Sequence, residues 1–252
     1  MTLLITGGAS GIGAATARLA AKRGHKVAIN YRSRDAQAKK VVADIIANGG
    51  QAVALPADVA RQADIVGLFD AAEKALGPVS HLVNSAGVGL SSRVEDFDGA
   101  ALERLFAINT VGLMLCCREA ARRMSTRRGG KGGVIVNVSS MAATIGGRPG
   151  VSAYAASKAA VDSFTMGFAK EVAQEGIRAV SLRPGMIETE MTEKTLTDRE
   201  VRSAIESTIA MGRVGQADEI ANAIVWLLSD EASFISGVTI DVSGGGFVFG
   251  KR

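Results

Sequence analysis

Apolar positions follow two different rhythms along the 252-residue chain. Short unbroken apolar runs are typical of strands buried on both faces, and longer stretches in which apolar residues recur every three or four positions are typical of amphipathic helices. The short runs predict strands at 3–6, 27–31, 52–55, 81–84, 134–138, 179–182 and 238–242. The longer stretches predict helices over 12–23, 36–48, 64–76, 102–124, 154–175 and 220–228. Because strand alternates with helix, we predict an α/β fold, a doubly wound parallel sheet of these seven strands flanked by helices on both faces.

The pattern gives no sign of a domain boundary. The chain holds four prolines, and no Ser/Pro-rich linker interrupts the alternation. We therefore predict a single domain over 1–252. The segment 188–213 fits the pattern least, since it is polar and weakly helical. A long excursion after a strand of an α/β sheet is a candidate lid over a substrate.

The composition argues against several classes of partner. The net charge is +4, but the 29 Lys and Arg are interleaved with 25 Asp and Glu and aromatic residues make up only 4%, so nucleic-acid binding is not expected. No leader with charged and apolar parts begins the chain and no apolar run reaches membrane-spanning length, so no membrane association is predicted. Cys116 and Cys117 are adjacent in an apolar helical stretch and badly placed to pair, which favours a reducing, cytoplasmic location. No grouping of His, Cys, Asp and Glu has metal-ligand spacing, so we predict no metal site.

The chemically unusual residues all follow the carboxyl ends of predicted strands. In open doubly wound sheets, ligands bind in the crevice outside these ends. The loops after the first six predicted strands therefore converge on one predicted site. In chain order, their residues are Gly7, Arg32, Asp58, Asn84 to Gly87, Ser139 with Ser140, and Pro184 with Gly185.

A glycine-rich stretch, TGGASGIG at 6–13, joins the first predicted strand to the first predicted helix. Glycines allow a tight turn and a close backbone approach, and the start of the helix offers free N–H groups to a pyrophosphate. A flexible turn is the alternative, but the strand before and the helix after favour nucleotide binding. The residues predicted to bind the cofactor here are Gly7, Ser10, Gly11, Ile12 and Gly13.

The end of the second predicted strand indicates which dinucleotide binds. NAD-preferring proteins place an acid there for the ribose 2′-hydroxyl, whereas a 2′-phosphate requires a cation. This chain has Tyr31, Arg32 and Ser33 there, and we predict that all three bind the cofactor. A guanidinium binds a phosphate through two charge-assisted hydrogen bonds, which favours NADP(H), with NAD as the weaker alternative; an ordinary solvated arginine is the other interpretation. After the third strand, Asp58 with Val59 is either an adenine contact or a cap of the next helix.

Tyr154 and Lys158 are four positions apart on a predicted helix and therefore share one face. A tyrosine hydroxyl, with an ordinary pKa of about 10, is a poor base at neutral pH, but a nearby ammonium favours the phenolate and lowers that pKa. Lys158 is thus expected to tune Tyr154 and to hydrogen-bond a nicotinamide ribose. Ser140, at the end of the fifth strand, supplies a hydroxyl that can polarise a carbonyl oxygen beside the tyrosine. A pair on a solvated helix surface is the alternative interpretation.

These motifs occur in one order along nearly the whole chain: Thr6-Gly7 with Gly11-Ile12-Gly13, Asn84-Ser85-Ala86-Gly87, Asn109, Ser139-Ser140, Tyr154 with Lys158, and Arg183-Pro184-Gly185. Together they resemble the short-chain dehydrogenase/reductase family. The resemblance implies a Rossmann fold and hydride transfer between a nicotinamide cofactor and a small-molecule carbonyl or secondary alcohol. It also implies a homotetramer, a dimer of dimers, assembled through the predicted helices 102–124 and 154–175 and the C-terminal stretch 238–249.

The resemblance implies a role for each site residue. Tyr154 would be the general acid/base, Lys158 would hold the ribose, Ser140 would bind the reacting oxygen and Asn109 would fix a water in a proton relay. Asn84 would steady the central strands, the Ile187 backbone would face the carboxamide, and Thr189 would face the phosphates. The further residues implied at the cofactor are Asn84, Ala86, Gly87, Tyr154, Lys158, Pro184, Gly185, Ile187 and Thr189.

Departures from the family pattern leave the substrate open. Ser10 stands where many NADP-preferring members carry a cation, which makes Arg32 the main cation. Glu175 stands where the similar 3-oxoacyl carrier-protein reductases tend to place a basic residue, which weakens a fatty-acid substrate. The stretch Asn30-Tyr31-Arg32-Ser33 is similar to that of glucose 1-dehydrogenases, so a sugar 1-dehydrogenase is an alternative. A non-catalytic, NADP-sensing scaffold or regulator is an alternative of another class, and the filled tetrad argues against it.

Overall fold

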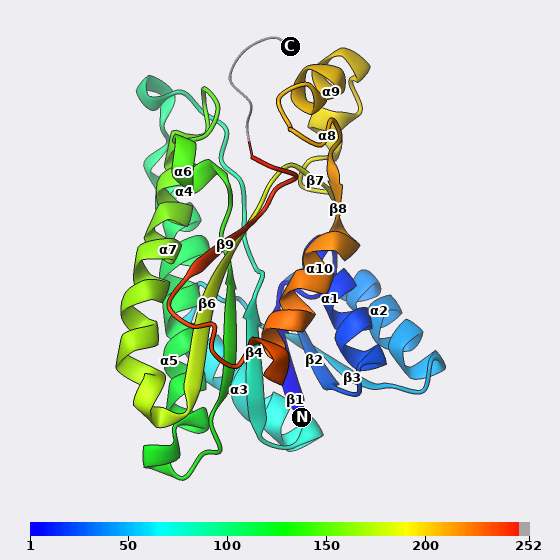
Figure 1. Ribbon diagram of the computed structural model, residues 1–252, viewed down its shortest axis with the longest axis vertical. Coiled ribbons are helices and arrows are strands. Elements are labelled where there is room, and N and C mark those ends of the chain that lie inside the picture. Colours follow the sequence, from blue (N-terminus) through cyan, green and yellow to red (C-terminus); the bar gives the residue numbers. More distant parts are fainter. Residues whose placement is uncertain (247–252) are drawn as a thin grey trace.

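A computed structural model describes residues 1–246, and a sheet of seven strands, all paired in parallel, forms its centre (Figure 1). The strands lie in the order β3-β2-β1-β4-β5-β6-β9, so the winding reverses between β1 and β4. Each predicted apolar run forms one of them, which confirms the predicted doubly wound sheet. The strands are β1 (Thr2–Thr6), β2 (Lys26–Tyr31), β3 (Gln51–Pro56), β4 (Val79–Asn84), β5 (Gly133–Val138), β6 (Ile177–Pro184) and β9 (Thr239–Val242).

Helices cover both faces of this sheet (Figure 1). One face carries α1, α2 and α10, and the other carries α3, α5 and α7. Each helix joins successive strands or covers their edge, as the alternation in the sequence predicts. Their bounds are α1 (Gly11–Lys22), α2 (Asp35–Ala47), α3 (Gln62–Leu76), α5 (Leu113–Met124), α7 (Ser152–Val172) and α10 (Ala217–Leu228), with a short α6 (Ala142–Ile145) before α7 and the 3-10 turns η1 (Val94–Asp96), η3 (Thr126–Arg128), η4 (Ala173–Glu175) and η5 (Asp230–Ala232).

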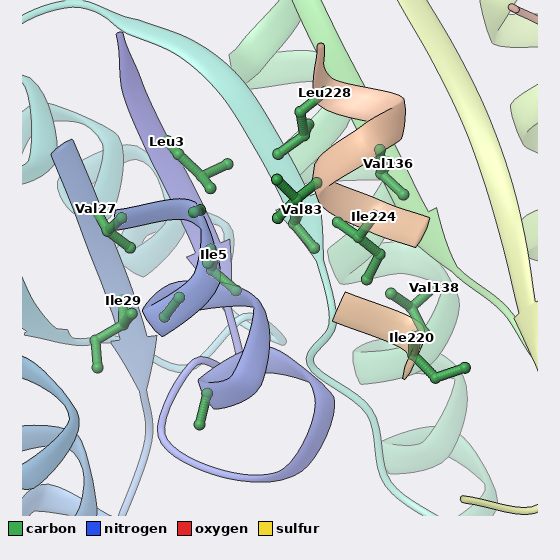
Figure 2. Packing of buried hydrophobic residues seen from close by; sticks show 14 of the residues in the cluster. Leu3, Ile5, Val27, Ile29, Val83, Val136, Val138, Ile220, Ile224 and Leu228 are labelled. Carbon is green, nitrogen blue, oxygen red and sulfur yellow. The ribbon is translucent and has the colours of Figure 1, made fainter. Parts of the chain in front are cut away.

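The strands send alternate side chains into two apolar cores. Leu3 and Ile5 pack in the core beneath α1 and α10, whereas Leu4 between them packs in the core beneath α3, α5 and α7, because successive side chains of a strand point to opposite faces. Figure 2 shows Ile220 and Ile224 of α10 lying against the strand side chains of the first core. Each fully buried leucine or isoleucine stabilises the fold by roughly 1.5–3 kcal/mol. Both cores thus hold the strand ends, and the loops on them, in place.

The predicted helix 102–124 is present but is not uniform. It consists of α4 (Gly99–Phe106), a π-helical segment η2 (Ala107–Gly112) and α5. Gly112 lies so close to the strand-end loop after β3 that a Cβ atom on it would be 2.3 Å from the Val59 carbonyl oxygen. A π turn adds one residue to the helical repeat and is frequent at functional sites. Asn109 lies within this turn.

Taken together, Gly99–Met124 form 26 helical residues that could span a membrane by length and composition alone. The prediction concerned unbroken apolar runs, and Glu103, Arg104 and Arg118 interrupt this stretch. The apolar side of α5, with Leu113, Cys116 and Cys117, is buried against the sheet in the second core. A core helix of a water-soluble protein has the same composition, because its sheet-facing side must be apolar.

The segment 188–213 is folded to a greater extent than its sequence indicates. It contains α8 (Glu193–Leu196) and α9 (Arg199–Glu206), and the short parallel pair β7 (Ile187–Glu188) and β8 (Gly215–Gln216) joins its two ends. Asp198 caps α9 by accepting hydrogen bonds from two backbone N–H groups, and a small apolar cluster lies beneath. Figure 1 shows the segment beyond the carboxyl end of the sheet, next to α10.

Candidate active site

The loop after β1 is shaped by glycines that have no room for a side chain. Gly7 has a φ of +67°, and a Cβ atom on it would lie 2.8 Å from the Ala86 Cα atom. A Cβ atom on Gly13 would lie 2.3 Å from the Gly7 carbonyl oxygen. α1 begins at Gly11, and its N-cap residue Ser10 makes no side-chain capping hydrogen bond. The first turn of α1 therefore presents backbone N–H groups beside a bare backbone surface, which suits a pyrophosphate.

The loop after β6 forms the opposite wall of this cradle. A Cβ atom on Gly11 would lie 3.3 Å from the Thr189 Cγ2 atom, so the two loops nearly touch. The Thr192 hydroxyl donates a 2.6 Å hydrogen bond to the Ile187 carbonyl oxygen and fixes the turn that carries Thr189. The Pro184 carbonyl oxygen accepts a 3.0 Å hydrogen bond from the backbone N–H of Met141, which follows Ser140. The predicted nicotinamide segment is thus bonded to the predicted catalytic loop.

One buried amide, Asn30 at the end of β2, ties together the loops after β1, β2 and β3. Its Nδ2 donates to the Ala57 carbonyl oxygen at 3.0 Å, and its Oδ1 accepts from the Gly7 N–H at 3.4 Å. Its own carbonyl oxygen accepts from the Gly8 N–H at 2.9 Å. No separate role for Asn30 was predicted, although a polar residue that ends a buried apolar strand is a signal for one.

The residues after Asn30 form an exposed basic loop. The Tyr31 hydroxyl donates a 2.6 Å hydrogen bond to Asp35, and this bond raises the pKa of Tyr31. Arg34 pairs with Glu190 from the loop beyond Thr189. Arg32 is exposed, like Ser33, and within residues 1–246 its side chain forms no hydrogen bond or ion pair. Arg32 is therefore the cation of this loop that is left available to an anionic ligand.

Asp58 is held by a partner that the sequence did not indicate. Its Oδ2 accepts a 2.7 Å hydrogen bond from Arg104 of α4, and its Oδ1 accepts one from the Ala60 N–H at 3.0 Å. Burial acts to raise the pKa of Asp58, but these bonds outweigh it, so the pKa lies below its ordinary value. α3 begins only at Gln62, so Asp58 is not its N-cap. Val59, the next residue, is buried in the second core.

Ser140 and Tyr154 meet at the carboxyl end of β5. The Ser140 hydroxyl accepts a 3.1 Å hydrogen bond from the Ala142 N–H, which fixes it at the start of α6. Tyr154 lies in the first turn of α7. Burial raises the pKa of Tyr154, and a hydrogen bond with Ser140 lowers it in part. The expectation that Lys158 lowers this pKa is not met in the structure, where the net direction is upward.

Lys158 lies one turn after Tyr154 and is buried. Its Nζ donates a 2.8 Å hydrogen bond to the Val138 carbonyl oxygen and lies 5.9 Å from the centroid of the Tyr154 ring. Burial lowers the pKa of Lys158 to about 8, and Asp162 opposes that shift. A Cβ atom on Gly87 would lie 3.6 Å from this Nζ. The ammonium is therefore enclosed between β5, α7 and the loop after β4.

Both the oxygen and the nitrogen of the Asn109 side-chain amide form hydrogen bonds, which link η2 to the loop after β4 and to α7. Its Oδ1 accepts from the Val88 N–H and its Nδ2 donates to the Val88 carbonyl oxygen, both at 2.9 Å, while Nδ2 also donates to the Ser157 hydroxyl at 3.1 Å. Ser157 in turn donates to the Tyr154 carbonyl oxygen at 2.7 Å. Asn109 thus fixes the loop after β4 against the helix that carries Tyr154 and Lys158. Ser157 was missed because its partner Asn109 lies 48 positions away along the chain.

Asn84 lies at the same strand ends but its side chain enters the core. Its Nδ2 donates to Asn137 of β5 at 2.9 Å and lies 3.4 Å from the Cys117 sulfur. The next two N–H groups, of Ser85 and Ala86, both donate to the Thr6 hydroxyl at 3.2 Å. The side chain therefore links the central strands, and only the backbone that follows it reaches the cradle.

Several of the predicted site residues lie against one another, whereas Arg32 and Ser33 are exposed and take no part in these contacts within residues 1–246. The set of contacting residues runs from the loop after β1, through Ala86 and Gly87, to Asn109 and Lys158, and from Ser140 to Tyr154. Sequence reasoning missed three side chains that support it, Asn30, Arg104 and Ser157. Each acts over 20 or more positions along the chain, as the 46-residue separation of Arg104 from Asp58 illustrates. The set combines a partly buried tyrosine hydroxyl, a buried lysine and a glycine-lined backbone cradle.

Sequence comparison shows close relatives over the full length. A family model described as enoyl-(acyl carrier protein) reductase matches residues 7–246. The chain is 44% identical over 247 residues to the uncharacterized oxidoreductase YgfF of Escherichia coli (strain K12), which covers 96% of this chain and 98% of that protein. It is 37% identical over 247 residues to L-rhamnose 1-dehydrogenase (NAD(P)(+)) of Sphingomonas sp. (strain SKA58), which covers 98% and 96%.

Solved structures also match this chain over nearly its whole length. The short-chain dehydrogenase/reductase from Serratia marcescens BCRC 10948 superposes with a TM-score of 0.89 at 29% identity, over 97% of this chain and 96% of that one. A blue fluorescent protein from a metagenomic library, solved in complex with NADPH, gives a TM-score of 0.89 at 31% identity with the same coverage. With the motif order, the doubly wound sheet and these matches in agreement, the chain belongs to the short-chain dehydrogenase/reductase family of oxidoreductases, which act on CH–OH and C=O groups.

Proposed function

We propose that the protein is an NADP(H)-dependent oxidoreductase that interconverts a carbonyl compound and a secondary alcohol, with Tyr154 as general acid/base. The observation that carries the proposal is the joining of Tyr154, Ser140 and Lys158 at the end of β5, next to the cradle after β1. This arrangement pairs a proton donor with a second hydroxyl and a buried cation, the groups that carbonyl reduction needs around the reacting oxygen.

The residues present fit a dinucleotide. Gly7, Gly11 and Gly13 leave the backbone of the cradle bare, and Thr189 closes it from the other side. Arg32 would hold the 2′-phosphate of NADP, and Asp58 would meet the adenine. A bound nicotinamide supplies the hydride or accepts it. The complex of a 31% identical neighbour with NADPH supports this choice, and the NAD(P)(+) in the name of the rhamnose enzyme leaves NAD as the weaker alternative.

The chain's own groups would move the proton. Since the pKa of Tyr154 is raised, its hydroxyl keeps its proton at neutral pH and can donate it to a carbonyl oxygen that becomes an alkoxide. Ser140 would hydrogen-bond the same oxygen. Lys158, with a pKa of about 8, is mostly an ammonium at pH 7 and would hold the ribose while it stabilises negative charge on Tyr154. Asn109 would act through the backbone that it fixes, in line with a water relay along η2.

The test is Tyr154→Phe, assayed with NADPH and a panel of reactive ketones and diketones. Loss of a general acid is expected to reduce turnover by about 10²- to 10⁴-fold. The chain has two tyrosines, so Tyr31→Phe is a matched control that removes a hydroxyl outside the catalytic group. Full turnover by Tyr154→Phe would end the proposal.

A sugar 1-dehydrogenase is the second candidate. It is favoured by the stretch Asn30 to Ser33 and by the 37% identity to L-rhamnose 1-dehydrogenase. Saturating glucose or L-rhamnose with NADP and with NAD tests it, and no formation of reduced cofactor rejects it. A non-catalytic sensor would bind NADPH but give no turnover with any carbonyl compound of the panel.

A homotetramer of cytoplasmic location is part of the proposal. The outer sides of α5 and α7 form a groove of about 350 Å³ that combines apolar and charged side chains. Phe164 and Phe168 stack there at a ring distance of 5.3 Å, and a second copy is the expected cover. Residues 247–249 of the implied C-terminal contact lie outside the described residues. Light scattering that gives a monomer would contradict the tetramer. The residues that line the groove are Met114, Arg118, Ala121, Arg122, Arg128, Phe164, Phe168, Glu171, Val172 and Glu175.

A further inference from the structure

Asp162 is a buried carboxylate on the helix that carries Tyr154 and Lys158. Its residue is 4% exposed, and it lies one helical turn beyond Lys158 on the same face of α7. Both of its oxygens bond to β6. The Ser181 hydroxyl donates to Oδ1 at 2.6 Å, and the Arg183 Nε donates to Oδ2 at 2.7 Å. Asp162 therefore joins the catalytic helix to the strand that leads into Pro184.

Arg183 lies between two carboxylates. Besides its bond to Asp162, it donates through Nη1 to Asp241 of β9 at 3.3 Å. Asp241 is about half exposed, whereas Asp162 is enclosed. Because water screens the exposed pair, Arg183 interacts more strongly with the buried carboxylate. The negative charge of Asp162 is thus partly neutralised from the side of β6.

Lys158 has no carboxylate in direct contact among residues 1–246. Its Nζ donates to the neutral Val138 carbonyl oxygen, and the loop after β4 with the Asn109 amide encloses it from the other side. The ionisable groups that face it are Tyr154 and Asp162 on its own helix and, behind Asp162, Arg183 on β6 and Asp241 on β9. Four residues of helix rise about 6 Å, so Asp162 is the nearest of these carboxylates and acts on Lys158 without touching it.

We propose that Asp162 is a positioning residue for the reaction: its carboxylate is the counter-ion that keeps Lys158 an ammonium, and Arg183 limits how much of its charge Lys158 feels. The inference deepens the proposed function and rests on it for the role of Lys158. Burial alone disfavours the ammonium, and the effect of Asp162 opposes burial. At an effective dielectric constant near 20, a full charge one helical turn away (~6 Å) moves a pKa by about two units, and partial neutralisation by Arg183 reduces this.

The two partners give opposite predictions. Asp162→Asn removes the negative charge, so the pKa of Lys158 should fall by about one unit. Arg183→Gln leaves that charge without its cation, so the pKa of Lys158 should rise. A residue that only stabilised the fold would not shift the two variants in opposite directions. Asp162→Glu should restore the wild-type value.

The direct readout is the pKa of Lys158 in the cofactor-free protein, measured by NMR titration of isotopically labelled lysine, with the signal assigned by its loss in Lys158→Met. The second readout is the alkaline limb of kcat/KM for carbonyl reduction, which needs the proton on both Tyr154 and Lys158. That limb should move to lower pH in Asp162→Asn and to higher pH in Arg183→Gln. The control is Glu231→Gln, the same charge change on an exposed residue of η5 near the opposite end of β6.

Both shifts together support the inference. An unmoved pKa in either folded variant, or shifts of the same sign, overturns it. If Asp162→Asn does not fold, Arg183→Gln alone decides, because an unmoved or lowered pKa contradicts the role of Asp162. The NMR arm needs no turnover, so an enzyme found inactive on every carbonyl compound would end the proposed function while the counter-ion remained testable.

Discussion

The two ends of the parallel strands bury ionisable groups in opposite ways. At the carboxyl end, Lys158 is enclosed with a carboxylate one turn away. At the amino end, His25 and His81 pack edge to face with ring centroids 5.2 Å apart. Burial lowers the pKa of both histidines, to about 4 for His81, so both are neutral at pH 7. The carboxyl end thus encloses a charged lysine, whereas this histidine pair at the amino end is neutral.

The buried charge of Lys158 is explained by the proposed chemistry, whereas the neutral histidine pair is explained by folding alone. A buried charge costs free energy unless it is paired, so nothing in the packing alone calls for Lys158. A neutral histidine pair costs little at neutral pH and becomes a liability only when acid protonates it. The carboxyl end is therefore where substitutions should reduce activity, and the amino end is where they should change stability.

The largest expected effect is at Lys158. Replacing it with Met should reduce turnover by about 100-fold or more, because Tyr154 loses its neighbouring cation. The melting temperature should stay the same or rise, since an apolar side chain removes the buried charge. Assays and thermal melts measure the two effects, and Lys170→Met, an exposed lysine on the same helix, is the control. A loss of stability that matches the loss of activity would break the comparison.

The second effect concerns acid. Because the pKa of His81 is about 4 in the folded protein and 6.5 ordinarily, the unfolded state binds the proton first as the pH falls. The contribution of His81 to the free energy of unfolding is therefore fully present above pH 6.5. It is lost between pH 6.5 and about 4, by about 3 kcal/mol in total. Chemical denaturation across this range measures it.

Carboxylates titrate in the lower part of the same range, so the histidine contribution is the difference between the wild type and His81→Gln. The glutamine variant should be less sensitive to acid from pH 6.5 to 5, where few carboxylates bind protons. If the free energy of unfolding falls equally with pH in the two proteins, the buried histidines do not set the acid sensitivity.

The third effect tests Arg32, the cation of the loop after β2 that has no side-chain partner within residues 1–246. Arg32→Ala should weaken NADP binding by about 10- to 100-fold through loss of charge-assisted hydrogen bonds, with NAD affinity nearly unchanged. Calorimetry with both dinucleotides gives the ratio. Arg34→Ala, whose guanidinium is already paired with Glu190, should change the ratio less. An unchanged ratio in Arg32→Ala removes the argument for NADP.

The smallest effect on cofactor binding is expected at Arg104, beside the proposed adenine site. Arg104→Gln removes the cation bonded to Asp58, and since this pair is partly exposed, cofactor binding should weaken only about two- to five-fold. NADP and NAD should be affected equally, because both carry the same adenine. A change in their ratio would assign Arg104 to the phosphate instead.

Much of the fold could be predicted because its signals are local. Each strand is predicted by an unbroken apolar run, and the alternation of strands with helices predicts the doubly wound parallel sheet. The π turn at Asn109 could not be predicted, because one extra residue barely alters an apolar period over 23 positions.

The candidate site divides in the same way. Gly7, Arg32, Ser140 and Tyr154 were predicted because each has the residue type that its local turn or helix requires. The partners that hold them were not, since Arg104 reaches Asp58 and Ser181 reaches Asp162 only through the tertiary fold. The pKa of Tyr154 was predicted in the wrong direction, because sequence spacing reveals a neighbouring cation but not the degree of burial.

Asn30 has a consequence for how such a protein can be changed. Its amide fixes the shape of three loops from the inside, while the exposed residues 32–34 supply the surface that a ligand meets. Shape and charge are therefore encoded by different side chains. A lineage, or an engineer, can exchange the outer residues and redirect the choice of dinucleotide without rebuilding the turn, so this preference can drift while the architecture beneath it stays fixed.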